Sequence, residues 1–327
     1  MKRIVFSLVA LLVCSGASGA ADPAPLMLAA KIPLGEVRGR VDHMAVDIEH
    51  RRLFVAELGN DSVGVVDVVN RRVLRTIAGL GEPQGVGYFT ATGTLYVANG
   101  RDGSVGLFEG AAFATAGRIE LGEDADDVRI DDKTPAVIVG YGSGALAVID
   151  PRNRRKIADI PLPAHPEGFA LDPANGRAYV NLPDARQIAI LDRADGKASR
   201  TVVTKEARAN FPMALTPEGT GFVVVFRNPP VLMAFSPDGA RRATVATCGD
   251  ADDVFVDAKR RRIYVSCGEG FIDVFDAAGQ SYARIAQIAT AAGARTSLFI
   301  PELDRLFLAV RAQGREQAAI WEFRPQP

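Results

Sequence analysis

The sequence has 327 residues, and its 38 Lys and Arg nearly balance its 39 Asp and Glu, which leaves a formal charge of −1. Hydrophobic residues make up 48% of the chain, enough to bury a sizeable core. The balanced charge argues against a nucleic-acid partner and against binding to an anionic membrane surface, because both require a basic surface.

The first residues have the three-part form of a secretory signal peptide. Lys2 and Arg3 precede an apolar run, Ile4–Val13, and small residues follow as far as Ala20. We therefore expect residues 1–21 to be removed on export, which places the mature protein in the periplasm or outside the cell. The apolar run is too short to cross a bilayer and no other stretch approaches that length, so we expect no membrane span.

From about residue 42 onward, a pattern of three short apolar segments returns at regular intervals. In the first copy the segments are 42–47, 53–56 and 63–68, separated by turns rich in Gly, Asn and Asp. This form is typical of short strands joined by hairpins. The middle segment occurs seven times, with starts 42, 42, 41, 44, 41 and 43 residues apart: Leu53–Ala56, Leu95–Ala98, Val137–Gly140, Ala178–Asn181, Phe222–Val225, Ile263–Ser266 and Leu306–Ala309.

The first six copies each add a fourth apolar segment, whereas the seventh stops at Pro327 after its third. A segment of the missing type lies ahead of the first copy, because Ile32–Gly35 matches the fourth segment at Ile160–Pro163. We therefore predict that the N-terminal segment supplies the outer strand of the last sheet and closes a ring. Seven four-stranded antiparallel sheets arranged in this way form an all-β, seven-bladed β-propeller, predicted here as a single domain over residues 22–327.

The runs Leu95–Asn99 (LYVAN) and Ser62–Asp67, together with their spacing, resemble the YVTN-repeat seven-bladed propellers of exported bacterial proteins. The resemblance covers essentially the whole mature chain. It implies an exported propeller of unassigned or scaffolding role. The aspartate that ends four of the third segments, at Asp67, Asp150, Asp192 and Asp276, is expected to cap a turn, and Ser236 and Glu322 stand in its place in copies five and seven.

In a propeller, the residues that begin each first segment gather around the mouth of the central channel, where ligands of such rings usually bind. Two successive positions therefore predict two rings of side chains, which we call the funnel. The first ring is Asp42, Gln84, Asp126, Glu167, Phe211, Asp252 and Arg295, and the second is His43, Gly85, Asp127, Gly168, Pro212, Asp253 and Thr296. The ring positions predict an acidic funnel with one arginine.

Carboxylates that converge on one axis repel one another unless a cation, a cationic ligand or protons relieve them. The candidate ligands of a divalent cation such as Ca²⁺ are Asp42, Asp126, Glu167 and Asp252. His43 and His165 could add nitrogen ligands to such a site, and they are also the candidate catalytic acid–base groups. A structural alternative stays open, in which these acids cap turns or pair with arginines such as Arg295 and Arg311.

Two cysteines remain after export, Cys248 and Cys267, and both fall in loops of the sixth copy on one face of the ring. In an oxidising compartment we expect them to form a disulfide. Closing a loop of about 18 residues would stabilise the fold by roughly 3 kcal/mol. The third cysteine, Cys14, lies in the signal peptide, and the bulk of Val13 before it argues against a lipoprotein.

Catalytic signatures are absent from the mature sequence: there is no HExxH, no GxSxG, no P-loop and no CxxCH. The leading hypothesis is therefore a binding or scaffold propeller that presents its acidic funnel to a small ligand, a cation or a periplasmic protein, with no catalysis required. The alternative is a metal-assisted enzyme, lactonase- or lyase-like, that uses the funnel carboxylates together with His43 or His165.

Overall fold

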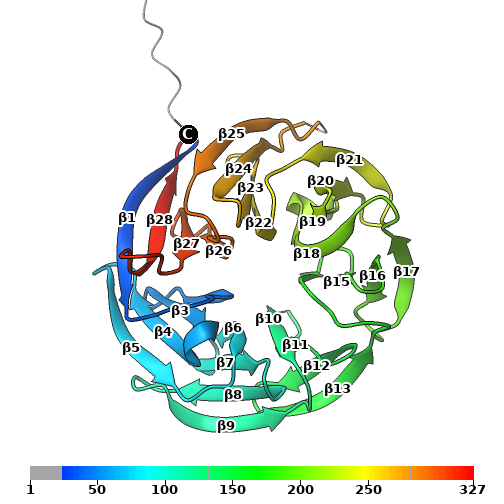
Figure 1. The fold of residues 1–327 in the computed structure, drawn as a ribbon. Coiled ribbons are helices and arrows are strands. Elements are labelled where there is room, and N and C mark those ends of the chain that lie inside the picture. The colour runs from blue at the N-terminus through cyan, green and yellow to red at the C-terminus, as the bar shows by residue number, and fades with distance from the viewer. Residues whose placement is uncertain (1–23, 132, 280) are drawn as a thin grey trace, which may run out of the picture.

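A computed structural model of the chain describes residues 24–131, 133–279 and 281–327. Within these ranges, seven four-stranded antiparallel sheets stand around one axis (Figure 1), which confirms the predicted seven-bladed propeller. The expected signal peptide lies outside the described residues. No helix in the described part of the chain has the length and apolar character needed to cross a membrane.

Each blade runs from an inner strand at the axis to an outer strand at the rim. Blades 1 and 2 are β2 (Met44–Asp47), β3 (Arg52–Glu57), β4 (Ser62–Asp67), β5 (Arg72–Ala78) and β6 (Pro83–Phe89), β7 (Thr94–Asn99), β8 (Ser104–Glu109), β9 (Ala114–Glu120). Blades 3 and 4 are β10 (Ala125–Asp131), β11 (Ala136–Tyr141), β12 (Ala145–Asp150), β13 (Arg155–Pro161) and β14 (Phe169–Asp172), β15 (Arg177–Leu182), β16 (Gln187–Asp192), β17 (Ala198–Val203).

The remaining blades follow the same order until the last. Blades 5 and 6 are β18 (Arg208–Leu215), β19 (Phe222–Asn228), β20 (Pro230–Phe235), β21 (Arg241–Ala246) and β22 (Ala251–Asp257), β23 (Arg262–Cys267), β24 (Phe271–Asp276), β25 (Arg284–Ala289). Blade 7 is β26 (Ser297–Ile300), β27 (Arg305–Val310), β28 (Ala318–Pro325) and the N-terminal β1 (Leu26–Gly35). Two short 3-10 turns, Leu58–Asn60 and Pro217–Gly219, complete the described elements.

The core is divided among the blade interfaces, because both faces of every blade are covered by a neighbour. The second strands are apolar at nearly every position for this reason, since successive side chains point to opposite faces of a sheet. Phe54, for example, packs in the cluster between blades 1 and 2, whereas its neighbour Leu53 packs in the cluster between blades 7 and 1. Among the described residues, one such hydrophobic cluster occupies each of the seven interfaces.

The ring is closed by β1, as the sequence predicts. This strand pairs antiparallel with β28, and Ile32 lies opposite Ile320. Ile32 is fully buried in the cluster between blades 7 and 1, while Leu26 at the other end of β1 is buried between blades 6 and 7. The closing strand therefore stabilises both interfaces of the last blade (Figure 1).

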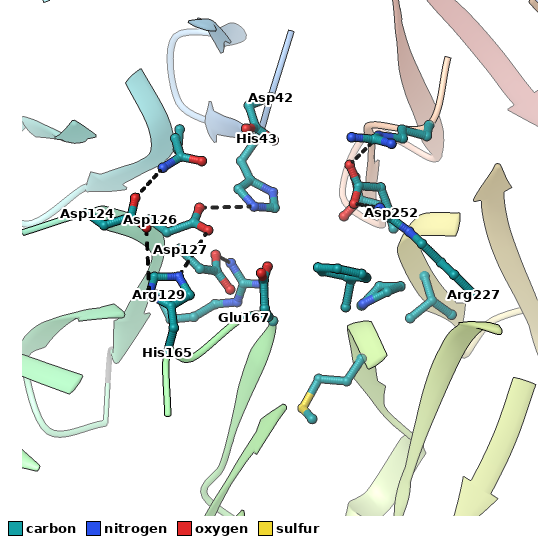
Figure 2. A pocket seen from close by; sticks show the side chains of 18 of the residues that line it. Asp42, His43, Asp124, Asp126, Asp127, Arg129, His165, Glu167, Arg227 and Asp252 are labelled. Carbon is teal, nitrogen blue, oxygen red and sulfur yellow. Dashed lines mark hydrogen bonds and ion pairs between the residues drawn. The ribbon is translucent and has the colours of Figure 1, made fainter. Parts of the chain in front are cut away.

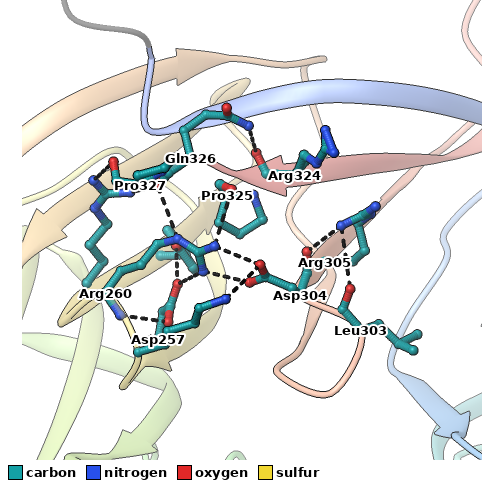
Figure 3. Close-up of polar contacts among 12 residues, drawn as sticks. Asp257, Arg260, Leu303, Asp304, Arg305, Arg324, Pro325, Gln326 and Pro327 are labelled. Carbon is teal, nitrogen blue, oxygen red and sulfur yellow. Dashed lines mark hydrogen bonds and ion pairs between the residues drawn. The ribbon is translucent and has the colours of Figure 1, made fainter.

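The end of β28 is also held by blade 6 (Figure 3). The Arg260 guanidinium donates to the two carboxylate oxygens of Asp304 at 2.6 and 2.7 Å and to the carbonyl oxygen of Gln326 at 3.1 Å. Arg262 donates to the same carbonyl at 2.6 Å. The hydrogen bond from Arg260 lowers the pKa of Asp304 to about 2. These contacts join the hairpin between β22 and β23 to the last blade.

Two local predictions are confirmed. Cys248 and Cys267 form a disulfide in blade 6, with their Cα atoms 5.9 Å apart. Asp67, at the end of β4, accepts hydrogen bonds from the backbone amides of Val69 and Asn70 at 3.0 and 2.9 Å, and so caps the turn that follows.

Candidate functional site

The predicted funnel residues meet at a cavity of about 680 Å³ at one end of the propeller axis, which we call the axial cavity. All seven residues of the first ring line it. Five residues of the second ring also line it: His43, Asp127, Gly168, Pro212 and Asp253. The sequence repeat therefore brings together side chains from all seven blades.

Local irregularities in the inner strands allow both ring positions to face the axis. Two successive residues of a regular strand point to opposite faces of the sheet. The register is interrupted by a bulge between Ala125 and Val128 in β10 and between Ala251 and Asp253 in β22. A bulge changes the direction in which the side chains of a strand point, so Asp126 and Asp127 both reach the cavity. In blades 1, 4 and 7 the ring residues precede the inner strand, so the alternation of side chains along a strand does not apply to them.

One side of the axial cavity, contributed mainly by blades 1, 3 and 4, gathers carboxylates and both candidate histidines (Figure 2). We call it the acidic wall, defined by His43, Asp124, Asp126, His165 and Glu167. The Nε2 atom of His43 lies 3.9 Å from Asp126 Oδ1, and the Nε2 atom of His165 lies 3.8 Å from Asp126 Oδ2. Asp126 therefore stands between the two imidazoles.

The orientation of the His165 ring is fixed by the backbone. Its Nδ1 atom lies 2.6 Å from the carbonyl oxygen of Gly142. A carbonyl can only accept a hydrogen bond, so Nδ1 carries the proton and donates it. The other nitrogen, Nε2, faces Asp126 and the cavity (Figure 2). Histidines that bind metals are commonly oriented by such a contact on the far nitrogen.

Glu167 is the remaining carboxylate of this wall, and its position differs from that of Asp126. Its side chain makes no hydrogen bond or ion pair with any residue in the described ranges. One ligand atom each from Asp126, His165 and Glu167 lies within 4.8 Å of the others. These three groups therefore form a cluster that could hold a metal ion.

The opposite side of the cavity pairs its acids with arginines. Asp252 accepts from Arg227, and its other oxygen lies 2.9 Å from Arg295 Nε. Arg295 also bonds Asp250 at 2.7 Å, and Arg227 lies over the ring of Phe211, 4.0 Å from its centre. Asp252 therefore fits the alternative in which a funnel acid pairs with arginines, because two guanidinium groups balance its charge.

Two further funnel acids also have arginine partners. Asp42 Oδ2 lies 2.8 Å from Arg40 Nη2, an ion pair whose angles fall short of a hydrogen bond. Asp127 accepts through Oδ1 from Arg129, but its buried Oδ2 has no hydrogen-bond partner among the residues that the structure describes. Asp127 is 1% exposed, so bulk water cannot readily donate a hydrogen bond to that oxygen.

The ring positions predict one arginine, but four line the cavity in the described part of the chain: Arg40, Arg129, Arg227 and Arg295. Only Arg295 occupies a ring position. Arg40 lies two residues before the ring residue Asp42, and Arg129 lies two residues after the ring residue Asp127. Arg227 extends to the cavity from the end of β19, the second strand of blade 5. Arg311, the other arginine expected to hold funnel acids, does not line the axial cavity.

Burial changes the proton affinity of the carboxylates in the axial cavity. It raises the pKa of Asp42 to about 6 and that of Asp253 to about 7. Burial also raises the pKa of Glu167 to about 8, and the neighbouring Asp126 carboxylate adds to the effect. Burial acts on Asp126 too, but contact with His165 and the charge of His43 hold its pKa below the ordinary value. Asp42, Asp253 and Glu167 therefore bind protons more readily than ordinary carboxylates do, whereas Asp126 keeps its charge.

The carboxylates raise the pKa of both histidines. Burial alone would lower the pKa of His43, but the charges of Asp127, Asp42 and Asp253 raise it to about 9. Contact with Asp126 raises the pKa of His165 to about 9, against the effect of burial. Both rings are consequently protonated at neutral pH while the cavity holds no other cation.

A second cavity of about 370 Å³ continues along the axis below the first. Six residues line both cavities: His43, Arg129, Met213, Asp253, Val254 and Phe255. Below them the walls are mostly apolar, with inner-strand residues such as Val86 and Phe169. The polar chemistry of the channel is therefore confined to its upper end.

The other predicted positions have ordinary roles. Gln84 donates to Asp124 at 3.0 Å, and the Thr296 hydroxyl donates to the carbonyl of Val41 at 3.3 Å. His50 is exposed and contacts Asp47 in the hairpin between β2 and β3, outside the residues that line the axial cavity. Asp124 was accessible to sequence reasoning, because it precedes Asp126 by two residues in the run GEDADD.

No protein-family model matches the chain, and no curated protein matches it. Among solved structures, the chain is similar to hydrazine synthase from Kuenenia stuttgartiensis, with a TM-score of 0.73 and 15% sequence identity. The match covers 91% of this chain and 96% of the other. At this identity the likeness shows the fold alone.

Proposed function

We propose that this protein is an exported propeller of the YVTN-repeat type that binds a small cationic ligand in its axial cavity, with no catalysis required. The observation that carries the proposal is the excess of acid around that cavity. Within the described ranges, four arginines and two histidines face nine carboxyl groups: Asp42, Glu123, Asp124, Asp126, Asp127, Glu167, Asp184, Asp252 and Asp253.

The arginines are engaged away from the acidic wall, so its carboxylates have only the two histidines as cationic neighbours. Arg227 and Arg295 share Asp252, and Arg40 contacts Asp42. A cation that enters the cavity reaches Asp126 and Glu167 without displacing an arginine, and it takes the place of the protons on Glu167 and the two histidines. A volume of about 680 Å³ suits a small molecule or a hydrated ion. The polar walls favour a charged ligand over an apolar one.

Calorimetric titration of metal-free protein tests this proposal, with spermidine as a cationic probe and citrate as an anionic probe. We expect spermidine to bind and citrate not to bind. Asp126→Asn should weaken spermidine binding about tenfold, because a partly buried charge pair is worth roughly 1–2 kcal/mol at an effective dielectric constant of about 20 or above. Glu302→Gln removes an exposed carboxylate elsewhere and should leave the affinity unchanged. Citrate binding, or equal effects of the two substitutions, would refute the proposal.

The proposal that the protein is exported can be tested separately. Expression of the full sequence in a bacterial host, followed by fractionation and N-terminal sequencing, should yield periplasmic protein that starts after Ala20 or Ala21. Intact protein in the cytoplasm would contradict the export part of the proposal. It would leave the cation-binding part standing, because the two rest on different residues.

A metal-assisted enzyme is the second candidate, and the cluster of Asp126, His165 and Glu167 favours it. His43 lies beside the cluster, and its raised pKa of about 9 suits a general acid better than a general base at neutral pH. A screen of lactones and of lyase substrates, with and without EDTA, tests this candidate. Activity that EDTA removes and that His43→Gln lowers would favour it over simple binding.

A further inference from the structure

We propose that Asp126, His165 and Glu167 form a site for one divalent transition-metal ion, with Zn²⁺ the best fit, and that the bound ion is open to the axial cavity. The inference rests on the proposed cation-binding function and specifies the cation and its ligands. It differs from the ligand set that the ring positions suggest, because it includes His165 and leaves out Asp42 and Asp252.

The spacing of the ligand atoms fits a metal ion after small side-chain movements. His165 Nε2 and Asp126 Oδ2 are 3.8 Å apart. A tetrahedral zinc ion with bonds of about 2.0–2.2 Å places neighbouring ligand atoms about 3.3–3.6 Å apart. A movement of a few tenths of an ångström therefore completes this pair. Glu167 offers a carboxylate oxygen within 4.8 Å of the other two ligand atoms. Its carboxylate is not restrained by a hydrogen bond or ion pair from any described residue.

The histidine ring is already oriented for coordination, and its Nε2 atom would release a proton when a metal ion binds. The Gly142 carbonyl oxygen accepts a hydrogen bond from Nδ1 at 2.6 Å, which leaves Nε2 as the nitrogen that faces the cluster. A metal-bound histidine usually has such a partner on its other nitrogen, because this fixes the ring and the tautomer. The contact comes from the loop after β11 of blade 3, so it is independent of Asp126 and Glu167.

A second observation also points to a ligand at this end of the cavity. Asp127 follows Asp126 on the bulge, lines the same cavity and is 1% exposed, yet its Oδ2 has no hydrogen-bond partner within the described residues. A buried carboxylate oxygen without a donor costs free energy. A rotation of the Asp127 carboxylate that turns this oxygen to the cavity would let a water molecule or ligand held by the metal ion supply the missing donor.

The other funnel acids are poorer ligands. Asp252 is held by Arg227 and Arg295, and a metal ion there would have to displace both. The donor set at the acidic wall is one imidazole nitrogen and two carboxylates. Imidazole suits zinc and neighbouring transition metals, whereas Ca²⁺ takes oxygen ligands alone in most sites. The nitrogen of His165 therefore favours Zn²⁺ over the Ca²⁺ that the carboxylates alone suggest.

Three protein ligands leave at least one coordination position free. Structural zinc sites usually have four protein ligands, while sites that bind a substrate or an activated water have three. Because the cluster lies on the wall of the axial cavity, the free position faces a space large enough for a small molecule. The site is thus built to present a metal ion to a ligand with an oxygen or nitrogen donor.

Calorimetry of metal-free protein with ZnCl₂ and with CaCl₂ tests the proposal, together with an anomalous difference map from a zinc-soaked crystal. We expect one zinc ion per chain, located between Asp126, His165 and Glu167, and much weaker binding of Ca²⁺. His165→Gln and Glu167→Gln should each weaken zinc binding at least about tenfold. The control is His50→Gln, which removes a histidine that contacts a carboxylate elsewhere, at 2.9 Å. It should leave the zinc affinity unchanged.

The spermidine titration separates this inference from the proposed function. Replacing His165 removes no negative charge, so His165→Gln cannot weaken binding that is driven by charge alone. Loss of zinc binding with spermidine binding retained supports the metal site. Zinc binding that survives His165→Gln and Glu167→Gln, or that is lost in His50→Gln, overturns the metal site while the cation-binding function stands. Failure of both probes on the wild-type protein overturns both. Circular dichroism of each variant shows whether it is folded.

Discussion

His165 and Asp126 face each other across the boundary between blades 4 and 3, with 3.8 Å between Nε2 and Oδ2. Asp126 lies on the bulge of β10, and His165 lies in the loop that leads into β14. The distance between them is therefore set by how the two blades pack. The chemistry of the acidic wall depends on contacts between inner strands, and substitutions at those contacts should affect it.

Gly85→Ala should disturb the acidic wall without touching any of its charged groups. A Cβ atom at residue 85 would overlap the backbone carbonyl oxygen of Asp126, which cannot move without shifting β10 against β6. We expect a loss of about 2 kcal/mol or more in the free energy of unfolding, the usual cost of overpacking, and weaker zinc binding. Urea unfolding and calorimetry measure the two effects.

Gly117→Ala is the matched control, because it places the same methyl group in another strand of blade 2. There a Cβ atom would meet only Leu107 Cδ2 at 3.9 Å, an ordinary contact. Stability should change by less than about 0.5 kcal/mol. Similar effects of the two substitutions would show that neither stability nor zinc binding depends on the close approach of β6 to Asp126.

Stability of the metal-free protein should fall as the pH rises from about 6 to 9. The folded-state pKa values of Asp42, Asp253 and Glu167 are raised to about 6, 7 and 8, and those of His43 and His165 to about 9. The folded protein therefore binds more protons than the unfolded chain in this range, and stability decreases with pH. Urea unfolding at intervals across the range, with EDTA present, measures the slope. A flat or rising profile would contradict the raised values.

Glu167→Gln should remove part of this pH dependence. Glutamine resembles the protonated carboxyl group that the folded state prefers below about pH 8. At pH 5 the variant and the wild type should be nearly equal in stability. At pH 8.5 the variant should be more stable by on the order of 1–3 kcal/mol. Metal-free unfolding curves at the two pH values check this, and lower stability of the variant at pH 8.5 would mean that Glu167 has an unrecognised cationic partner.

Asp252→Asn should act in the opposite direction, although it also removes a funnel carboxylate. Asp252 separates the guanidinium groups of Arg227 and Arg295, which repel each other without it. Removing one partner of a buried ion pair costs about 3–5 kcal/mol. Asp250 still contacts both arginines, so we expect a smaller loss of about 1–3 kcal/mol. Thermal and urea unfolding at pH 7 measure it, and stabilisation would contradict the pairing.

The repeat in the sequence was enough to predict the blades, the closing strand and the ring positions. The alternation of hydrophobic residues and the spacing of the segments depend directly on backbone geometry. Because all seven copies have the same geometry, a strand that is unclear in one copy can be assigned from the others. Ile32 illustrates this, because its match to a fourth segment placed it opposite a strand at the far end of the chain.

The pairing of charges in the axial cavity could not be predicted in the same way. A long arginine side chain can reach the axis from outside the ring positions, as Arg129 and Arg227 do. Which acid it neutralises depends on rotamers and on neighbouring blades, and the repeat carries no information about either. His165 was a candidate because of its proximity to Glu167, but its ring orientation depends on a carbonyl of the preceding blade.

The pairing of β1 with β28 also has a consequence for how the protein is made. The first strand of the described chain has no partner until the last strand emerges from the ribosome, so the final sheet cannot assemble during synthesis. The other six sheets consist of strands that follow one another along the chain, so we expect closure of the ring to be a late step in folding.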